Sequence, residues 1–301
     1  MKKALYGILV IVILGLGWYL FIKDYNYKIR FETPHAPGTV YSTLLNWDLS
    51  KSEAIDSLIL IDSEPFETLQ YEVQLGDSTF TYNWNIERIN DSLSDVTAYV
   101  KDNQNSFKQN LLVPFKKTEF VKRNIEMVQN MMNGLHAHAE IYKVDMSNVE
   151  EVTVESQYCA YITLSSSIYK KGNTMISNIG LIMNYIRDND IPIKGDPFVQ
   201  IQDWDIENEK ITYDFCFPIE KIENLPPTKT IKFKNTPEFK GLMAKFNGNY
   251  RLSDRAWYEL LDYADNKNID LQYRPFEIYR NDPHAGGNEM EWTAEVYMPL
   301  K

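Results

Sequence analysis

The sequence predicts an α+β protein in three parts: a transmembrane helix, an antiparallel sheet covered by a long helix, and a duplicated βαββ domain. Three observations lead to this prediction. Residues 4–22 form a charge-free apolar run, several β-rich segments then precede an amphipathic segment, and the C-terminal half contains an internal repeat. We expect domain boundaries at 1–24, 25–146 and 147–301.

The composition excludes several classes of protein. With 301 residues and 44% hydrophobic residues, the chain is long enough for two domains and too apolar to be disordered. A net charge of −11 argues against nucleic-acid binding, which depends on Lys and Arg. The two cysteines, Cys159 and Cys216, form neither a disulfide framework nor a zinc-binding spacing. We therefore expect no nucleic-acid partner, no metal and no cofactor.

The apolar run at residues 4–22 is about as long as the roughly 20 residues that a helix needs to cross a bilayer. Trp18 and Tyr19 lie near its end, where aromatic rings prefer the headgroup layer. A cleaved signal peptide is the alternative, but the usual small-x-small cleavage site is missing. The run predicts a single-pass membrane protein that contacts the lipid bilayer through residues 4–22, with its soluble part outside the cytoplasm.

Residues 25–146 predict the first soluble domain. Residues 25–32 suit a strand, and 37–46 suit a short helix with a proline in its first turn. Further strands are expected at 58–61, 68–75, 79–86, 92–100 and 110–113, separated by turn-forming residues. Apolar side chains recur every three or four positions over residues 117–137, which predicts a long helix on the sheet.

This order of elements, with Asn46-Trp47 after the first helix, resembles the START-related helix-grip superfamily, also called SRPBCC or polyketide-cyclase-like. The resemblance implies an apolar ligand between the sheet and the long helix. The alternative is that the Met and Phe side chains of the helix fill the core. His136, His138 and Glu140 follow at the helix end. Their i, i+2 spacing puts them on different faces, which favours solvated side chains over a metal site.

The C-terminal half contains an internal repeat. Residues 183–186 and 197–198 recur as 261–264 and 275–276, and residues 211–218 resemble 292–299. Each copy predicts a strand (159–164 and 241–246), a helix (173–189 and 253–267, with Ser253 as N-cap) and a hairpin. The two halves are expected to pack around a pseudo-twofold axis.

The last strand of each copy has one apolar face, formed by even positions of 292–300 and odd positions of 211–217. These faces are expected to meet the helices. The opposite faces carry Asp214 in one copy, and Glu295 with Tyr297 in the other. Two interpretations stay open: an acidic groove between the halves, or a sheet face in solvent.

The paired units, the Phe246-Asn247-Gly248-Asn249-Tyr250 turn and the final Thr293–Leu300 strand resemble the GyrI-like effector-binding domain of drug-sensing regulators. The resemblance implies that Glu295 lies in a central cleft and contacts a cationic, apolar small molecule. A second candidate is Asp214, the carboxylate at the equivalent position of the first copy. Aromatic candidates are chosen by residue type and approximate place: Tyr297, Tyr161, Tyr158, Trp257 and Tyr250. The helix-turn-helix domain of the regulators is not found in this sequence.

The expected function is therefore that of a membrane-anchored protein that binds a small organic cation in its C-terminal cleft. One alternative is a hydrolase in which Glu295, its pKa raised by burial among aromatic rings, acts as general acid or base. The other is a scaffold that binds another envelope protein. Whether the protein is an enzyme stays open.

Overall fold

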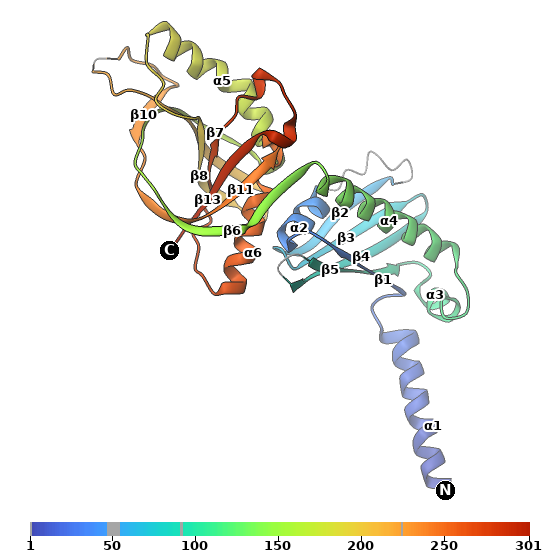
Figure 1. Ribbon diagram of the computed structural model, residues 1–301. Coiled ribbons are helices and arrows are strands. Elements are labelled where there is room, and N and C mark those ends of the chain that lie inside the picture. The colour runs from blue at the N-terminus through green and yellow to red at the C-terminus, as the bar shows by residue number, and fades with distance from the viewer. Residues whose placement is uncertain (1, 47–54, 91–92, 224) are drawn as a thin grey trace. The chain divides into compact units, whose positions relative to one another are not determined.

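The computed structural model describes residues 2–46, 55–90, 93–223 and 225–301, which form two compact units (Figure 1). Unit 1 spans residues 1–136 and unit 2 spans residues 137–301. Each unit has its own antiparallel sheet, which confirms the predicted α+β class. The boundary expected between residues 146 and 147 falls inside a strand of unit 2, Tyr142–Val154. Trp47 lies outside the described residues.

Within the described residues, unit 1 has a five-stranded sheet in the order β1-β5-β4-β3-β2. The strands are β1 Tyr27–Thr33, β2 Ser57–Glu64, β3 Thr68–Leu75, β4 Ser78–Asn90 and β5 Leu93–Asp102. Helix α2, Pro37–Leu45, begins with a proline, whose missing N–H would have no partner in the first turn. The predicted meander of strands, preceded by a short helix, is confirmed.

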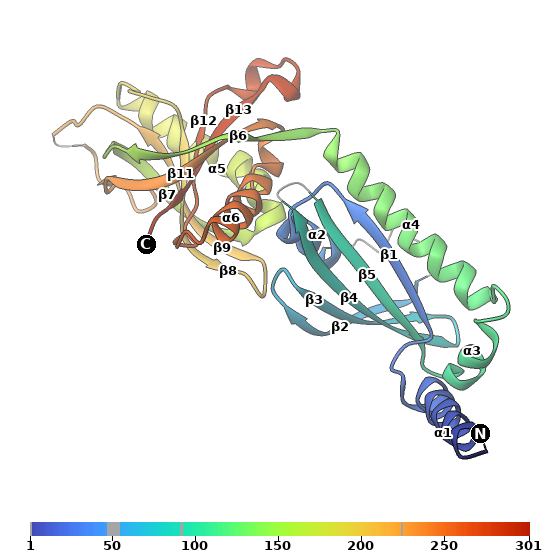
Figure 2. The same cartoon turned by 60° about the horizontal axis from the view of Figure 1, so that its bottom comes forward.

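Helix α4, Glu119–Ala139, runs alongside the strands of this sheet (Figure 2). Its buried side chains recur every three or four residues, as the sequence predicts. Val128, Met131 and Leu135 belong to the same core cluster as Trp84 of β4. The apolar face of the helix therefore helps to fill the core of unit 1.

Residues 110–113 were expected to form a strand, but residues up to 112 belong to helix α3, Ser106–Leu112. A four-residue apolar run cannot by itself distinguish a strand from a helix. Contacts distant in sequence favour the helix here: Asn26 donates a hydrogen bond to the Asn110 side chain, 84 residues away, at 2.7 Å.

Helix α1, Lys2–Gly17, ends before the predicted membrane span does, and a π-helical segment, Trp18–Ile22, follows. With 16 residues, α1 extends about 24 Å, less than the ~30 Å of a bilayer core. Phe21 stacks on Phe107 of α3, with ring centroids 5.4 Å apart. Among the described residues, no helix is long and apolar enough to cross a membrane. The predicted single-pass membrane location is therefore wrong. The predicted contact of residues 4–22 with a lipid bilayer is unsupported.

Within the described residues, unit 2 has an eight-stranded sheet in the order β10-β7-β9-β8-β12-β13-β11-β6. The strands are β6 Tyr142–Val154, β7 Tyr158–Ser167, β8 Phe198–Asp205, β9 Lys210–Pro218, β10 Lys232–Asn235, β11 Phe239–Gly248, β12 Phe276–Tyr279 and β13 Thr293–Pro299. Strand β6 precedes β7 in the chain but pairs with β11, whereas β10 precedes β11 and pairs with β7. Each edge of the sheet is thus supplied from the opposite half of the chain.

Helices α5, Lys171–Asp188, and α6, Arg255–Lys267, cover one face of this sheet, which we call the helix face. The opposite face is called the far face. Short 3-10 helices lie at Ile168–Lys170, Tyr250–Leu252, Pro283–Ala285 and Glu289–Glu291. The predicted N-cap of α6 is wrong: the helix begins at Arg255, and the buried Ser253 hydroxyl instead bonds a carboxylate oxygen of Glu277 at 2.9 Å.

Candidate functional site

The strand registers place the charged side chains of unit 2 on two different faces. Ala294, Val296 and Met298 of β13 are fully buried on the helix face, as the sequence predicts. Glu295 alternates with them and so lies on the far face. Glu277 of β12 pairs with Val296, which places its carboxylate on the helix face.

The seven residues predicted to bind the ligand do not form one site. Tyr158 is the first residue of β7, and the other six fall into two groups. The first group lies on strands of the far face and comprises Glu295, Tyr297, Asp214 and Tyr161. The second group belongs to α6 and the 3-10 helix before it, on the helix side, and comprises Trp257 and Tyr250. The sheet separates the two groups.

Glu295 is held by two donors. Arg280 Nη2 lies 2.6 Å from its Oε2, and the Tyr297 hydroxyl donates to the same oxygen at 2.7 Å. Burial alone would raise the pKa of the Glu295 carboxyl, but these hydrogen bonds and the Arg280 charge outweigh it and lower the pKa. The expected rise of this pKa is therefore wrong. An ionised, doubly bonded carboxylate is poorly placed to donate a proton as a general acid.

Replacing Glu295 with glutamine should reduce the acid sensitivity of unit 2. A carboxyl with a depressed folded-state pKa stabilises the fold above its ordinary pKa of 4.5, and this contribution is lost as the pH falls through the folded-state value. From about pH 5 to about pH 3, wild type should lose up to about 1 kcal/mol more than Glu295→Gln, because the ion pair is partly exposed. Urea unfolding at each pH measures this, and parallel pH profiles would contradict it.

Asp214, the other predicted carboxylate of the far face, also has an internal cation. Lys234 Nζ lies 2.5 Å from Asp214 Oδ2 and 4.6 Å from the centre of the Tyr161 ring. Thr163 and Gln202 donate further hydrogen bonds to this carboxylate at 2.7 and 3.0 Å. The position expected for an organic cation between a carboxylate and an aromatic ring thus holds a lysine ammonium.

The centre of the far face is packed with apolar side chains. Phe198 and Phe276 stack with ring centroids 4.7 Å apart, and Tyr297 meets Phe276 edge to face at 6.2 Å. These residues are buried and belong to one core cluster with Cys159 and Cys216. This part of the far face is a small hydrophobic core.

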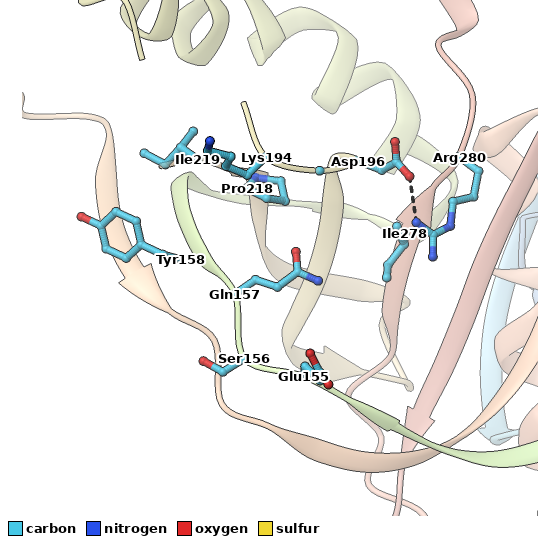
Figure 3. A pocket seen from close by; sticks show the side chains of 11 residues that line it. Glu155, Ser156, Gln157, Tyr158, Lys194, Asp196, Pro218, Ile219, Ile278 and Arg280 are labelled. Carbon is cyan, nitrogen blue, oxygen red and sulfur yellow. Dashed lines mark hydrogen bonds and ion pairs between the residues drawn. The ribbon is translucent and has the colours of Figure 1, made fainter. Parts of the chain in front are cut away.

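A polar cavity of about 500 Å³ lies beside this core, and Arg280 contributes to its wall (Figure 3). We call it the Arg280 pocket. Its polar groups include the carboxylates of Glu155 and Asp196, the Gln157 amide and the Lys194 ammonium. The whole lining comprises Glu155, Ser156, Gln157, Tyr158, Lys194, Gly195, Asp196, Pro218, Ile219, Ile278 and Arg280. Arg280 Nη1 lies 2.8 Å from Asp196 Oδ2, so this guanidinium joins Asp196 to Glu295.

The helix face contains a buried polar cluster that the sequence analysis missed. Lys171 at the start of α5 and Glu277 form an ion pair of 2.5 Å, with both side chains fully buried. Ser253, Trp257 and Tyr279 also bond the Glu277 carboxylate, at 2.9 Å from Ser253 Oγ and 2.6 Å from Trp257 Nε1. Lys171 Nζ further lies 4.6 Å from the Trp257 ring centre. One signal for this cluster was present in the sequence. Side chains alternate along β12, so Glu277 must lie on the opposite face of the sheet from Phe276 and Ile278.

Between α5 and the second half of unit 2 lies a cavity of about 650 Å³, which we call the α5 pocket. Its apolar and aromatic lining comprises Met175, Ile176, Ile179, Met183, Ile193, Pro197, Phe215, Phe217, Tyr250, Tyr279 and Trp292. Ile176 and Ile193 are 51% and 44% exposed. Tyr250, a predicted ligand residue, donates to the carbonyl of Thr293 at 2.9 Å, and its burial raises its pKa to about 12. A concave apolar surface with a few fixed polar groups is typical of small-molecule sites.

Comparison with known families identifies the C-terminal half of the chain. The family described as GyrI-like small molecule binding domain matches residues 147–301, more than half of the sequence. The chain belongs to the GyrI-like family. The resemblance seen in the sequence is thereby confirmed for these residues. Among the described residues, no three His, Cys, Asp or Glu side chains gather as metal ligands in or near this GyrI-like domain or elsewhere.

Solved structures similar to this GyrI-like protein include the EcmrR C-terminal domain, with 14% identity over 53% of this chain and 98% of that chain, and a TM-score of 0.45. SAV2435 bound to tetraphenylphosphonium has 12% identity over 51% and 94% of the two chains, and a TM-score of 0.38. A hydrolase encoded by lin2189 from Listeria innocua has 9% identity over 51% and 92%, and a TM-score of 0.35. No curated protein matches the sequence.

Proposed function

We propose that this protein is a small-molecule receptor whose ligand occupies the α5 pocket. The observation that carries the proposal is the cavity itself: about 650 Å³, lined mainly by apolar and aromatic side chains. Ile176 and Ile193 expose large apolar surfaces on its wall. Covering such surface with an apolar molecule is favourable by roughly 25 cal/mol per Å².

The residues predicted from the sequence take different roles in this proposal. Tyr250 forms part of the pocket wall, and Trp257 lies deeper, where it helps to fix the buried carboxylate of Glu277. On the far face, Glu295 and Asp214 hold the internal cations Arg280 and Lys234. We propose that the far-face residues maintain the shape of the sheet and that the ligand contacts the helix face.

We also propose two finer points about the architecture. The strand order is consistent with a duplication: the runs β7-α5-β8-β9 and β11-α6-β12-β13 match, and the two halves of the sheet meet between β8 and β12. A pseudo-twofold axis would pass between these strands. The five-stranded sheet and long helix α4 of unit 1 support a helix-grip domain.

Filling the α5 pocket should abolish binding. Gly180 lies within α5 on the pocket wall, and a Cβ atom there would meet no other atom within 4 Å. In Gly180→Trp, the indole should occupy the pocket, while loss of a helical glycine should keep the fold at least as stable as wild type. Titration of the full chain with the fluorescent, uncharged probe 1-pyrenebutanol should show at least about a tenfold loss of affinity, about the effect of 1.4 kcal/mol.

Gly134 provides the matched control. It lies within helix α4 of unit 1, and a Cβ atom there also meets nothing within 4 Å. Gly134→Trp adds the same side chain to a helix outside unit 2, and pyrenebutanol should bind this variant as it binds wild type. The proposal is rejected if wild type fails to bind the probe, or if Gly180→Trp binds it as tightly as Gly134→Trp does.

A further inference from the structure

The carboxylates expected to attract a cation are already paired within unit 2. Glu277 pairs with Lys171 at 2.5 Å, Glu295 with Arg280 at 2.6 Å and Asp214 with Lys234 at 2.5 Å. The Glu277 carboxylate also accepts three further hydrogen bonds, which use the remaining acceptor sites of its two oxygens. None of these groups therefore presents an uncompensated negative charge to a ligand.

The acidic side chains in the lining of the α5 pocket are engaged as well. Asp196 pairs with Arg280 at 2.8 Å. Asp282 accepts a hydrogen bond from the backbone N–H of His284 at 2.9 Å, and Glu289 accepts one from the Asn249 amide at 2.9 Å. Asp196 is thus neutralised by a counter-charge, whereas Asp282 and Glu289 accept hydrogen bonds from neutral donors and keep their negative charges at the exposed rim.

Arg251 is the exception among the charged residues of this lining. It belongs to the 3-10 helix Tyr250–Leu252, lines the α5 pocket and is exposed. In the part of the chain that the structure describes, its guanidinium forms no ion pair or side-chain hydrogen bond. The pocket therefore has a positive group with all of its donors available.

The aliphatic part of the Arg251 side chain packs against Gly172 in the first turn of α5. A Cβ atom at Gly172 would lie 2.7 Å from Arg251 Cγ and 3.3 Å from its Cα, so only glycine permits this approach. Gly172 itself lines the pocket.

We propose that the α5 pocket binds an apolar organic anion, with a hydrophobic body against α5 and a carboxylate or similar group on Arg251. This inference rests on the proposed function and names its ligand class. The apolar lining accounts for the body, and the guanidinium fork accounts for the anionic group, which it can bind with two parallel hydrogen bonds. The charge is opposite to that implied by the sequence resemblance.

Three probes that share one hydrophobic body test the charge. They are 1-pyrenebutyrate, 1-pyrenebutanol and the trimethylammonium analogue of the same length, each titrated against the full chain by fluorescence. In wild type, pyrenebutyrate should bind at least about tenfold more tightly than the ammonium probe, the effect of one charge-assisted hydrogen bond. Its advantage should shrink at high salt, because the rim of the pocket is exposed to solvent.

Arg251→Met keeps most of the apolar stem and removes the charge. It should weaken pyrenebutyrate binding by about tenfold and leave pyrenebutanol binding unchanged. The matched control is Arg274→Met, which removes an exposed arginine of unit 2 that does not line the pocket. Arg274→Met should bind all three probes as wild type does.

The outcomes separate this inference from the proposed function. If no probe binds wild type, or if Gly180→Trp binds them all, both are overturned. If Gly180→Trp abolishes binding but the three probes bind wild type equally, or Arg251→Met lowers all three affinities alike, the anionic class is overturned and the pocket stands. Preference for the ammonium probe also overturns the anionic class, in favour of a cation.

Discussion

Replacing Lys171 with methionine should lower the free energy of unfolding of unit 2 by about 3–5 kcal/mol. The substitution removes the ammonium but leaves Glu277 in a fully buried position. A buried carboxylate without its counter-charge must remain ionised at high cost or take up a proton. The Trp257 ring would also lose the cation that now lies 4.6 Å from its centre.

Urea unfolding of the full chain, followed by tryptophan fluorescence, measures this effect. The double variant Lys171→Met with Glu277→Gln is the control, because it removes both charges while keeping the size of each side chain. It should recover at least about half of the lost stability, since a neutral amide costs less to bury than an unpaired carboxylate. A loss for Lys171→Met below about 1 kcal/mol, the range of exposed ion pairs, would show that the buried pair is unimportant to the fold.

Replacing Phe276 with alanine should destabilise unit 2 by about 3–5 kcal/mol, the cost of removing a buried phenyl ring and leaving a cavity. Phe276 is 2% exposed and contacts the rings of Phe198 and Phe239, with centroids 4.7 and 5.5 Å away. If the far face is a core and the α5 pocket is the binding site, the folded variant should bind pyrenebutanol with unchanged affinity.

Phe233 of edge strand β10 serves as the comparison. It is only partly buried and stacks on Tyr158 at 6.5 Å, so Phe233→Ala should cost much less than Phe276→Ala. Thermal unfolding gives the order of the two variants, and probe titration gives their affinities. Equal losses of stability, or loss of probe binding in Phe276→Ala alone at a temperature where it is folded, would count against the assignment of the two faces.

Local patterns predicted much of the fold. Strand β3, Thr68–Leu75, matches its predicted range, because its side chains alternate along the segment and a turn follows directly at residues 76–77. The long helix α4 was found from its apolar period. Helix α3 was missed because a side chain that favours it, Asn26, lies 84 residues from its partner Asn110 and outside the helix's own sequence pattern. The length of α1 was misjudged because hydropathy alone does not show where a helix changes its winding.

The candidate site was only partly predictable. Tyr250 was chosen by its residue type and approximate place, and it lines the α5 pocket. Lys171 and Glu277 lie 106 residues apart, and no spacing rule connects them. Arg280, likewise, follows β12 and reaches Glu295 only because the hairpin folds back. Sequence patterns identify which face of a strand is polar, but the counter-charge of a carboxylate depends on tertiary contacts.

The exchange of edge strands has a consequence for how unit 2 is made. Strand β6 ends at Val154, yet its partner β11 begins at Phe239 and ends at Gly248, so much of the domain must be synthesised before β6 can be paired. Cutting the chain between β9 and β10 would leave strands of each fragment without their partners, since β10 pairs with β7 and β6 pairs with β11. Unpaired edge strands tend to pair with strands of other chains, which leads to aggregation. We therefore expect that the two fragments, produced separately, aggregate alone and recover a native fold only when they are refolded together.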